Sequence, residues 1–363
     1  MMTFYKELQL NAAQSKSVIK DSKTKKEKFY HIAVYIFKVI ITVLFAIAAI
    51  MLFTTFCGDE NRMAGVVVLL SVLLFRNINL EIKMSHSFLS LFIIYAVLIF
   101  APHLANLANG VHPLAALPVH LISIFVIAFL GCRNLNTFNQ FVLVLGYLLL
   151  YGYDVSGKSY LLRIAGMSVG LSLVMLIYFV KHKGNLPDAT LKNLFKEFNI
   201  RSRRTSWQIK LTLALSTLLT FAELVGLKRG MWAGIAAMSV LVPLVKDIPK
   251  RAARRTIGNI AGGAVFTAIY CILPESVVQL VGIFGGLGTG FSAKYKWQSM
   301  FNSLGAMSMA VVALGSLQEA VLYRIVNNVV GAVYGILFGL VFHKIGALIL
   351  KGIHTKKKIT NAG

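Results

Sequence analysis

Long apolar runs separated by short polar segments repeat along almost the whole chain, from Ile32 to Phe342. Such runs predict membrane-spanning helices, because about 20 apolar residues cross the ~30 Å hydrocarbon core of a bilayer. We expect an all-α membrane protein of about twelve transmembrane helices. Six are predicted at residues 32–53, 63–75, 88–104, 114–131, 138–151 and 160–180. Six more are predicted at residues 207–227, 231–245, 256–273, 277–291, 300–317 and 321–342.

The polar segments divide these helices into two halves. The predicted parts are a cytoplasmic N-terminal tail of low order (1–31), a first six-helix repeat (32–180), a basic cytoplasmic linker (181–206), a second six-helix repeat (207–342) and a basic cytoplasmic tail (343–363). An even number of crossings gives both halves the same orientation, which predicts two parallel six-helix repeats about a pseudo-two-fold axis normal to the bilayer.

The repeat is visible in individual residues. Arg163, Gly170 and His182 correspond to Arg324, Gly331 and His343, and every pair is offset by 161 residues. The second helices of the two halves also correspond, and both are short and flanked by glycine. Short or interrupted spans at matching positions of two halves point to a transport site; tilted helices beside longer neighbours are the alternative.

Composition and charge support the same class. The chain is 57% hydrophobic and only 14% charged, whereas a soluble domain has about 25% charged residues. The net charge of +24 lies between the apolar runs and at both ends, which is typical of topogenic charge rather than of a nucleic-acid-binding face. With both termini inside, the inner segments hold 29 of the 37 basic residues. We therefore expect a multi-pass protein of the plasma or inner membrane, with cytoplasmic termini and anionic lipids as neighbours.

An arginine followed by small residues recurs at three predicted helix starts. The three occurrences are Arg255-x-x-Gly258-x-x-x-Gly262, Arg163-x-x-Gly166-x-x-x-Gly170 and Arg324-x-x-Asn327-x-x-x-Gly331. Small residues at this spacing let helices approach closely. Each arginine is expected in the first turn of its helix, where the free N–H groups, the helix dipole and the guanidinium together favour an anion. These three positions are candidate anion sites.

Each basic candidate also has a simpler explanation. Arg255 is predicted on the cytoplasmic side, where the positive-inside rule alone accounts for it. Arg163 and Arg324 are predicted on the poorly charged outer side, where snorkelling to the interface is the alternative. Lys38 and Lys210 form a matched pair near the inner ends of the first helices, and they either snorkel or line the inner mouth of an anion path.

Two further residues are candidates for proton coupling. Glu223 is the only carboxylate inside a predicted span, and an ion pair with Lys228 or Arg229 is the first expectation for it. His120 also lies inside a span, where it is either hydrogen-bonded within the bundle or free to titrate near neutral pH.

Signatures of catalysis are absent from the sequence. The chain has no phosphate-binding loop, no metal-ligand spacing and no pair of carboxylates within the spans. We predict no enzyme activity, no cofactor and no metal ion.

The second half contains a further set of motifs. They are Trp232-Ala233, Val242-Pro243, Lys250-Arg251 and Arg255-x-x-Gly258-Asn259-x-x-Gly262, followed by Arg324-x-x-Asn327-Asn328-x-x-Gly331. This set resembles the fusaric-acid-resistance-like (FUSC) family of the aromatic acid exporter superfamily, which usually has Thr at the position of Asn259. The resemblance covers residues 207–342 best, and it adds Trp232, Gly258, Asn259 and Asn328 to the candidate anion-binding residues.

The resemblance implies export of aromatic or other small organic anions, with the proton gradient as one candidate driving force. Plant malate channels of the same superfamily build an anion path from two six-helix units, so a passive organic-anion channel is the first alternative. A non-transporting membrane scaffold or lipid-binding protein is the second. Larger family exporters carry a cytoplasmic domain, whereas this chain has a linker of 26 residues between its halves. Whether the chain forms a homodimer stays an open question.

Overall fold

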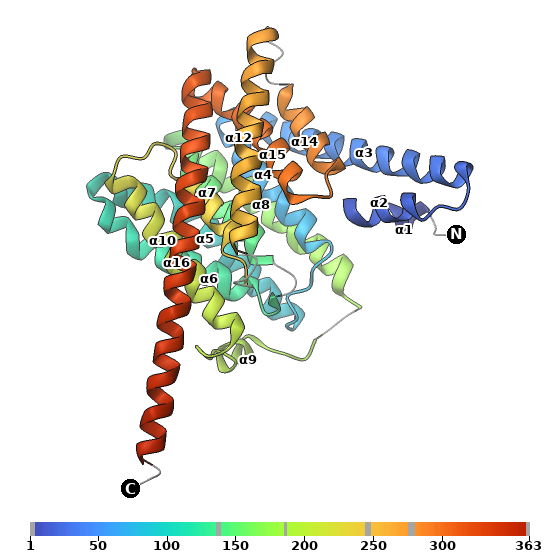
Figure 1. Cartoon of the computed structure of the whole chain (residues 1–363). Coiled ribbons are helices and arrows are strands. Elements are labelled where there is room, and N and C mark those ends of the chain that lie inside the picture. The colour runs from blue at the N-terminus through green and yellow to red at the C-terminus, as the bar shows by residue number, and fades with distance from the viewer. Residues whose placement is uncertain (1–3, 136–138, 185–186, 244–247, 275–279, 361–363) are drawn as a thin grey trace.

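The computed structural model of the chain is helical throughout, and it describes residues 4–135, 139–184, 187–243, 248–274 and 280–360 (Figure 1). No strand occurs within these ranges. The helices are α1 (Phe4–Leu8), α2 (Ala12–Lys20), α3 (Lys25–Cys57), α4 (Arg62–Phe75), α5 (Met84–Val111), α6 (Pro113–Gly131), α7 (Asn139–Gly152), α8 (Gly157–His182), α9 (Leu191–Lys196), α10 (Arg203–Leu224), α11 (Met231–Val240), α12 (Ile248–Ile272), α14 (Val281–Phe291), α15 (Tyr295–Leu314) and α16 (Leu317–Thr360).

Each apolar run predicted as a span corresponds to one of these helices. The predicted range 114–131 matches α6 to within one residue, and the range 63–75 matches α4 equally well. The predicted ends at Phe138, Val245 and Val277 lie outside the described residues. α16 continues to Thr360, so most of the predicted C-terminal tail is helical.

The helices differ in length and in how apolar they are. Five described helices are long and apolar enough to cross a membrane: α3, α5, α6, α8 and the Leu317–Ile345 part of α16. α4 and α11 have only 14 and 10 residues. At 1.5 Å per residue they extend about 21 and 15 Å, which is less than the ~30 Å core. Nine residues of each are buried, so both short helices lie inside the protein.

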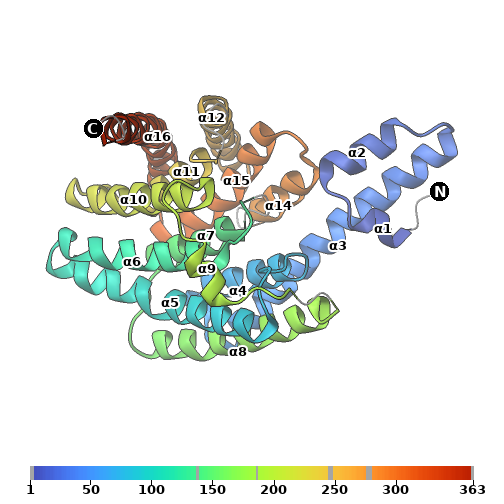
Figure 2. The same cartoon turned by 90° about the horizontal axis from the view of Figure 1, so that it is seen from below.

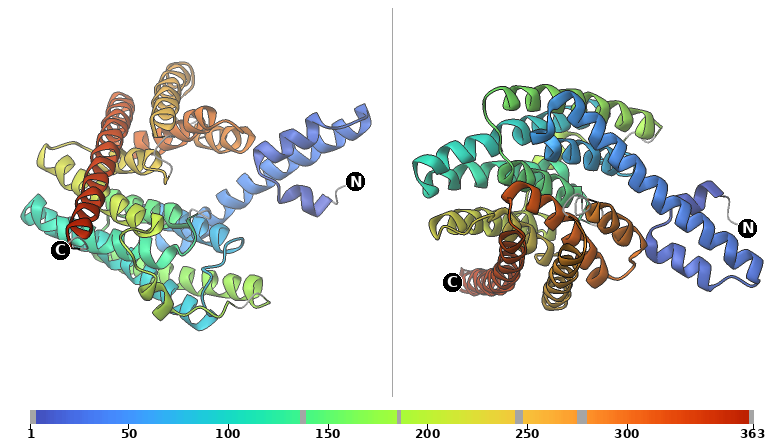
Figure 3. Two further views of the ribbon diagram at one scale, coloured as in Figure 1. Left: turned by 60° about the horizontal axis from the view of Figure 1, so that its bottom comes forward. Right: turned by 90° about the horizontal axis from the view of Figure 1, so that it is seen from above.

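The long helices run in two principal directions. In Figure 2, α5, α6, α8 and α10 lie in the plane of the view, whereas α12 and α16 are seen almost end-on. Figure 3 shows the same crossing from two further sides. α16 packs alongside α11, because Gly331 and Gly335 lie against Ala233 and Ala237 in step, and a Cβ on Gly331 would clash with the Ala233 carbonyl oxygen.

Several helix contacts occur in both halves. α4 packs on α8 as α11 packs on α16, and α6 packs on α7 as α14 packs on α15. Between the halves, α10 packs on α6 and α3 packs on α14, so the first helix of each half contacts the fourth helix of the other. The largest hydrophobic cluster contains residues of both halves.

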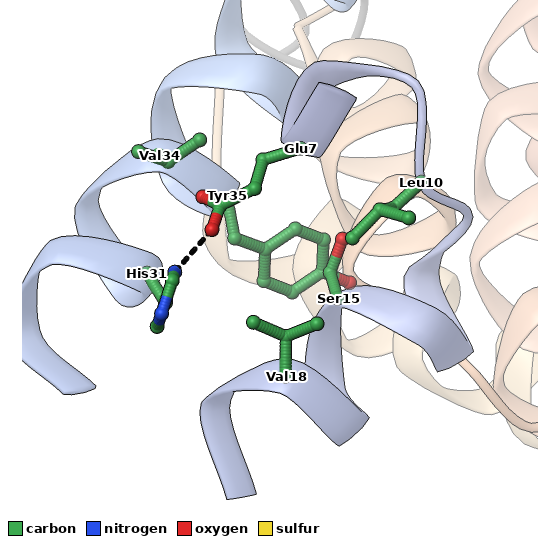
Figure 4. Close-up of a pocket in the computed structure, with 7 residues that line it drawn as sticks. All are labelled: Glu7, Leu10, Ser15, Val18, His31, Val34 and Tyr35. Carbon is green, nitrogen blue, oxygen red and sulfur yellow. Dashed lines mark ion pairs between the residues drawn. The ribbon is translucent and has the colours of Figure 1, made fainter. Parts of the chain in front are cut away.

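The N-terminal segment forms helices, contrary to the expectation of low order. α1 and α2 fold back on α3 and project with it from the rest of the molecule (Figure 1). Asn11 caps α2 through a capping box with Gln14. Glu7 of α1 forms a buried ion pair with His31 of α3 beside a small pocket lined by Tyr35 (Figure 4). These contacts order a segment whose polar composition alone predicts no structure.

The linker is also held against the protein. Glu197 accepts hydrogen bonds from Arg133 at 2.7 Å and Arg204 at 2.9 Å. The hydrogen bond from Arg133 lowers the pKa of the Glu197 carboxyl below its ordinary value of 4.5, against the raising effect of burial. The ring of Phe195 in α9 packs 5.0 Å from that of Phe129. The linker therefore packs against the C-terminal end of α6 and the N-terminal end of α10.

Candidate functional site

α11 forms the centre of the second half. Its residues from Met231 to Val240 are buried with the sole exception of Ile235. The free carbonyl groups at its C-terminal end receive N–H donors from neighbouring helices, as helix ends require. The indole of Trp207 donates to the carbonyl of Leu241 at 2.8 Å, and the guanidinium of Arg251 donates to that of Ser239 at 3.1 Å.

Lys210 is one of these C-terminal donors. It is 6% exposed, and its ammonium donates to the carbonyl of Val242 at 3.5 Å, a long hydrogen bond. A cation at a helix C-terminus also interacts favourably with the helix dipole. The structure thus places Lys210 at the end of the short buried helix, and not at an exposed interface where it would snorkel.

Arg255 of α12 is buried beside α16 and α15. Its Nε donates to Oδ1 of Asn328 at 3.1 Å and its Nη1 donates to the Tyr295 hydroxyl at 3.4 Å. Nη2 is buried without a hydrogen-bond partner. The side-chain amide of Asn259, one turn later, donates to the Arg255 carbonyl at 2.9 Å and to the Ser299 hydroxyl at 3.0 Å. The guanidinium is therefore held in place with part of its donor capacity unused.

Arg324 of α16 lies next to this group. It is 3% exposed, and its guanidinium carbon lies 5.3 Å from the ring centroid of Trp232 in α11. Its Nε is buried without a hydrogen-bond partner. Asn328 connects the two arginines, because its amide donates to the Arg324 carbonyl at 2.7 Å while its oxygen accepts from Arg255. The two charges are close enough to interact electrostatically.

The two arginines share an uncompensated positive charge. Among the described residues, no carboxylate lies within 4.0 Å of Arg255 or Arg324. Buried charges are normally paired, because desolvation of an unpaired ion costs several kcal/mol. We call this group, made of Arg255, Arg324, Asn328, Tyr295 and Trp232, the arginine centre.

The location of the arginines within their helices corrects one prediction. Arg163, Arg255 and Arg324 are the seventh, eighth and eighth residues of α8, α12 and α16, about two turns after each start. The helices begin earlier than the apolar runs; Ser316, for example, caps α16 by accepting from the N–H of Glu319 at 3.3 Å. Helix-end effects fade within the first turn. The free N–H groups of a helix start therefore cannot contribute at these arginines.

The small residues of the motif act as predicted. A Cβ on Gly258 would lie 2.6 Å from the carbonyl oxygen of Lys296, and one on Gly262 would lie 2.7 Å from that of Met300. Because real Cβ atoms do not approach oxygen so closely, both glycines are needed where α12 meets α15. Gly170 has the same role in α8, where a Cβ would lie 2.5 Å from Val68.

Arg163 and Lys38 have partners within the protein. Arg163 donates to Asn61 at 2.9 Å and to the Tyr153 carbonyl at 2.6 Å, and its Nη1 lies 3.6 Å from Asp154. Lys38 donates to the Leu10 carbonyl at 2.9 Å and to the Ser15 hydroxyl at 2.6 Å, which fixes α2 to α3. Neither residue is part of the arginine centre.

Glu223 and His120 lie in a second cluster, between α6, α7 and α10. Glu223 accepts a hydrogen bond from the Tyr151 hydroxyl at 2.9 Å, so the expected ion pair with Lys228 or Arg229 is absent from the described contacts. His120 is fully buried, with Nδ1 2.7 Å from the Tyr147 hydroxyl and its ring 4.9 Å from that of Tyr151. The tyrosines thus connect the two proton-coupling candidates.

Sequence reasoning missed Tyr295, Tyr151 and Tyr147. A tyrosine in an apolar run resembles any other core aromatic, and its hydroxyl shows a role only when its neighbours are known. Arg251 was predicted only as part of the Lys250-Arg251 motif and not as a site residue, yet its guanidinium lies 4.4 Å from the Tyr295 ring centroid.

These features define the class of the protein. An all-helical chain with several spanning-length apolar helices and two short buried ones is a multi-pass membrane protein. Residues 215–338 match the family model described as "Fusaric acid resistance protein-like", which confirms the predicted family resemblance over most of the second half. That segment contains α11, Arg255 and Arg324, and its family indicates a role in membrane transport. No curated protein and no protein of solved structure matches the chain.

Proposed function

We propose that this protein is a transporter of the plasma or inner membrane that exports small organic anions, and that the anion binds at the arginine centre. The observation that carries the proposal is the pair of buried guanidiniums, each with an unused N–H donor and without a carboxylate among the described residues. A bound anion supplies the missing negative charge and accepts the unused donors.

The surroundings of the two arginines suit an organic anion. A carboxylate fits the fork of guanidinium donors better than a spherical ion does. Trp232 and Tyr295 place aromatic surfaces beside the charged groups, and these surfaces favour an apolar or aromatic body attached to the carboxylate. Aromatic acids are therefore the proposed substrates.

The position of the centre also supports transport. It lies beside a helix that is too short to span a bilayer, with Arg324 stacked on Trp232 near the start of that helix. Transporter sites are commonly built at short or broken helices near the bilayer midplane. In the proposed topology both termini are cytoplasmic, and the proton gradient drives export through the cluster of His120 and Glu223.

The test is anion flux in liposomes that contain the purified protein. A panel of aromatic and dicarboxylic acids is compared with and without an imposed pH gradient. The proposal predicts slow, saturable flux that responds to the gradient and is lost in Arg255→Gln and Arg324→Gln. The control is Arg76→Gln, which changes an exposed arginine at the end of α4.

Other outcomes of this test contradict the proposal. Large currents that follow voltage alone identify a passive channel. The absence of flux for every acid, from folded wild-type protein, identifies a scaffold or lipid-binding protein. Unchanged flux in both arginine variants removes the arginine centre as the binding site.

A further inference from the structure

A row of polar side chains follows one ridge of α10. Gln208, Thr212, Ser216 and Thr220 recur every four residues, a spacing that places neighbours on the same side of a helix. They are 0%, 5%, 0% and 4% exposed. Such a row is unusual inside a membrane protein, because each buried hydroxyl or amide needs a hydrogen-bond partner.

Each of these four side chains has a buried atom without a partner. The atoms are the oxygens Oε1 of Gln208, Oγ1 of Thr212, Oγ of Ser216 and Oγ1 of Thr220. Other hydroxyls of the protein satisfy themselves on the carbonyl four residues earlier, as Ser71 does at 2.8 Å in α4. Thr217 in the same helix does so at 2.5 Å. The hydroxyls of the row therefore differ from their neighbours in α10.

Both ends of the row are placed by hydrogen bonds. Gln208 donates from Nε2 to the carbonyls of Ala128 at 2.9 Å and Cys132 at 3.1 Å, at the end of α6. Glu223, three residues after Thr220, accepts from Tyr151 of α7. The row thus lies on the face of α10 that packs along α6, at the interface between the two halves.

His120 contributes a fifth unpaired atom from the opposing helix. Its Nδ1 is bonded to Tyr147, and its Nε2 is buried without a partner. The opposite face of α10 bonds to Tyr334 of α16 through Thr217 at 2.6 Å.

Five unpaired buried polar atoms along one interface are costly if the interface is dry. Each such group costs about 1–3 kcal/mol when it has lost water and gained no partner. Ordered water removes this cost where several polar atoms converge. A chain of water molecules bonded to hydroxyls and an imidazole is also a path along which protons move.

We propose that α6 and α10 enclose a file of water molecules that conducts protons between Gln208 and Glu223 by way of His120. At each step one O–H or N–H bond forms as another breaks, so Nε2 of His120 receives a proton from one water while Nδ1 releases one to the Tyr147 hydroxyl, whose own O–H proton passes to the next water. The Glu223 carboxylate accepts the proton at its end of the file. The coupling of this path to anion export rests on the proposed function, whereas proton movement itself does not.

The titratable and charged groups around the file are few among the described residues. α7 contributes Tyr147 and Tyr151, and α10 contributes Glu223. Arg204 and Cys132 lie at the Gln208 end, where Arg204 is paired with Glu197. α5, which packs on α6, contributes the buried Tyr95.

The test removes the hydroxyls without changing the shape of the row. The triple variant combines Thr212→Val, Ser216→Ala and Thr220→Val, and Ser216→Ala alone is the milder variant. Thr42→Val and Ser168→Ala are matched controls, because both hydroxyls are exposed and bonded to backbone carbonyls. Proton uptake into liposomes is followed with a trapped pH-sensitive dye under an imposed voltage. Anion exchange is measured separately without a pH gradient.

We expect the triple variant to lose proton uptake, to retain anion exchange and to unfold at the same or a higher temperature than the wild type. Wild-type proton uptake in the triple variant overturns the proposal, and so does a wild-type protein that takes up no protons. A marked fall in melting temperature in Ser216→Ala also overturns it, because it shows hydroxyls paired within a dry interface. Wild-type protein that moves protons but no anion contradicts the proposed function alone.

Discussion

At the residue scale, Arg163 and Arg324 occupy corresponding positions of the two halves but have different surroundings. Arg163 has the acceptors Asn61, the Tyr153 carbonyl and Asp154, whereas Arg324 lies over the ring of Trp232 with an unused Nε donor. The offset of 161 residues predicts equivalent positions but carries no information on partners. One arginine therefore has its acceptors within the protein, and the other keeps an unused donor.

This difference predicts opposite effects of the same substitution. Arg163→Met removes the donors to Asn61 Oδ1 and to the Tyr153 carbonyl, and should lower the free energy of unfolding by about 1–3 kcal/mol. Arg324→Met removes an unpaired buried charge and should leave stability unchanged or increase it. Thermal unfolding of both variants in the same detergent, without added anion, measures the difference. Equal destabilisation would show that Arg324 has a structural partner.

At the element scale, the close contact of α16 with α11 depends on Gly331. Gly331→Ala should destabilise the protein by about 1–3 kcal/mol through overpacking, because the added Cβ must displace the α11 backbone. Gly110→Ala is the matched control: it lies in α5 with no atom within 4 Å of the added Cβ, and should stabilise by about 0.5–1 kcal/mol. Thermal unfolding compares the two variants, and equal effects would contradict the close contact.

The elements themselves were largely predictable, but their arrangement was not. Apolar runs fix where α4 and α6 lie in the sequence, because burial away from water, in lipid or inside the protein, requires apolar side chains whatever the partners. The beginnings of α8, α12 and α16 were placed too late, because polar helix starts carry no hydropathy signal. The packing of α16 against α11, the meeting of Arg255 with Asn328 and the bond from Tyr151 to Glu223 are tertiary contacts, which no local pattern encodes.

The linker provides a prediction on pH. The lowered pKa of Glu197 means that its ion pairs stabilise the docked linker above pH 4.5, and that this contribution is lost as pH falls through the folded-state pKa. The protection of residues 187–202 against hydrogen exchange, relative to the intrinsic exchange rate at each pH, should therefore fall as the pH drops through the folded-state pKa of Glu197. Glu197→Gln should remove the pH-dependent part of this linker protection. Asp188→Asn, an exposed acid of the same linker, is the control and should behave as the wild type.

At the scale of the whole molecule, α10 lies between two different environments. One face contacts α6 and carries the unpaired row from Gln208 to Thr220, and the other contacts α16 and the end of α11. An export cycle that exchanges protons for anions needs two such paths joined by a shared element. A movement of α10 would change the contacts on both of its faces.

The central claim is that an organic anion binds between Arg255 and Arg324, and anion-dependent thermal stability tests it most directly. A small aromatic carboxylate such as benzoate is titrated against the wild type, the Arg255→Gln/Arg324→Gln double variant and the Arg76→Gln control. A ligand at 100 times its Kd stabilises the folded state by about 2.7 kcal/mol, so we expect a rise in melting temperature for the wild type and the control that continues with the logarithm of the benzoate concentration above its Kd. The double variant should show none. An equal rise in all three proteins, or no rise in any of them, would contradict the account.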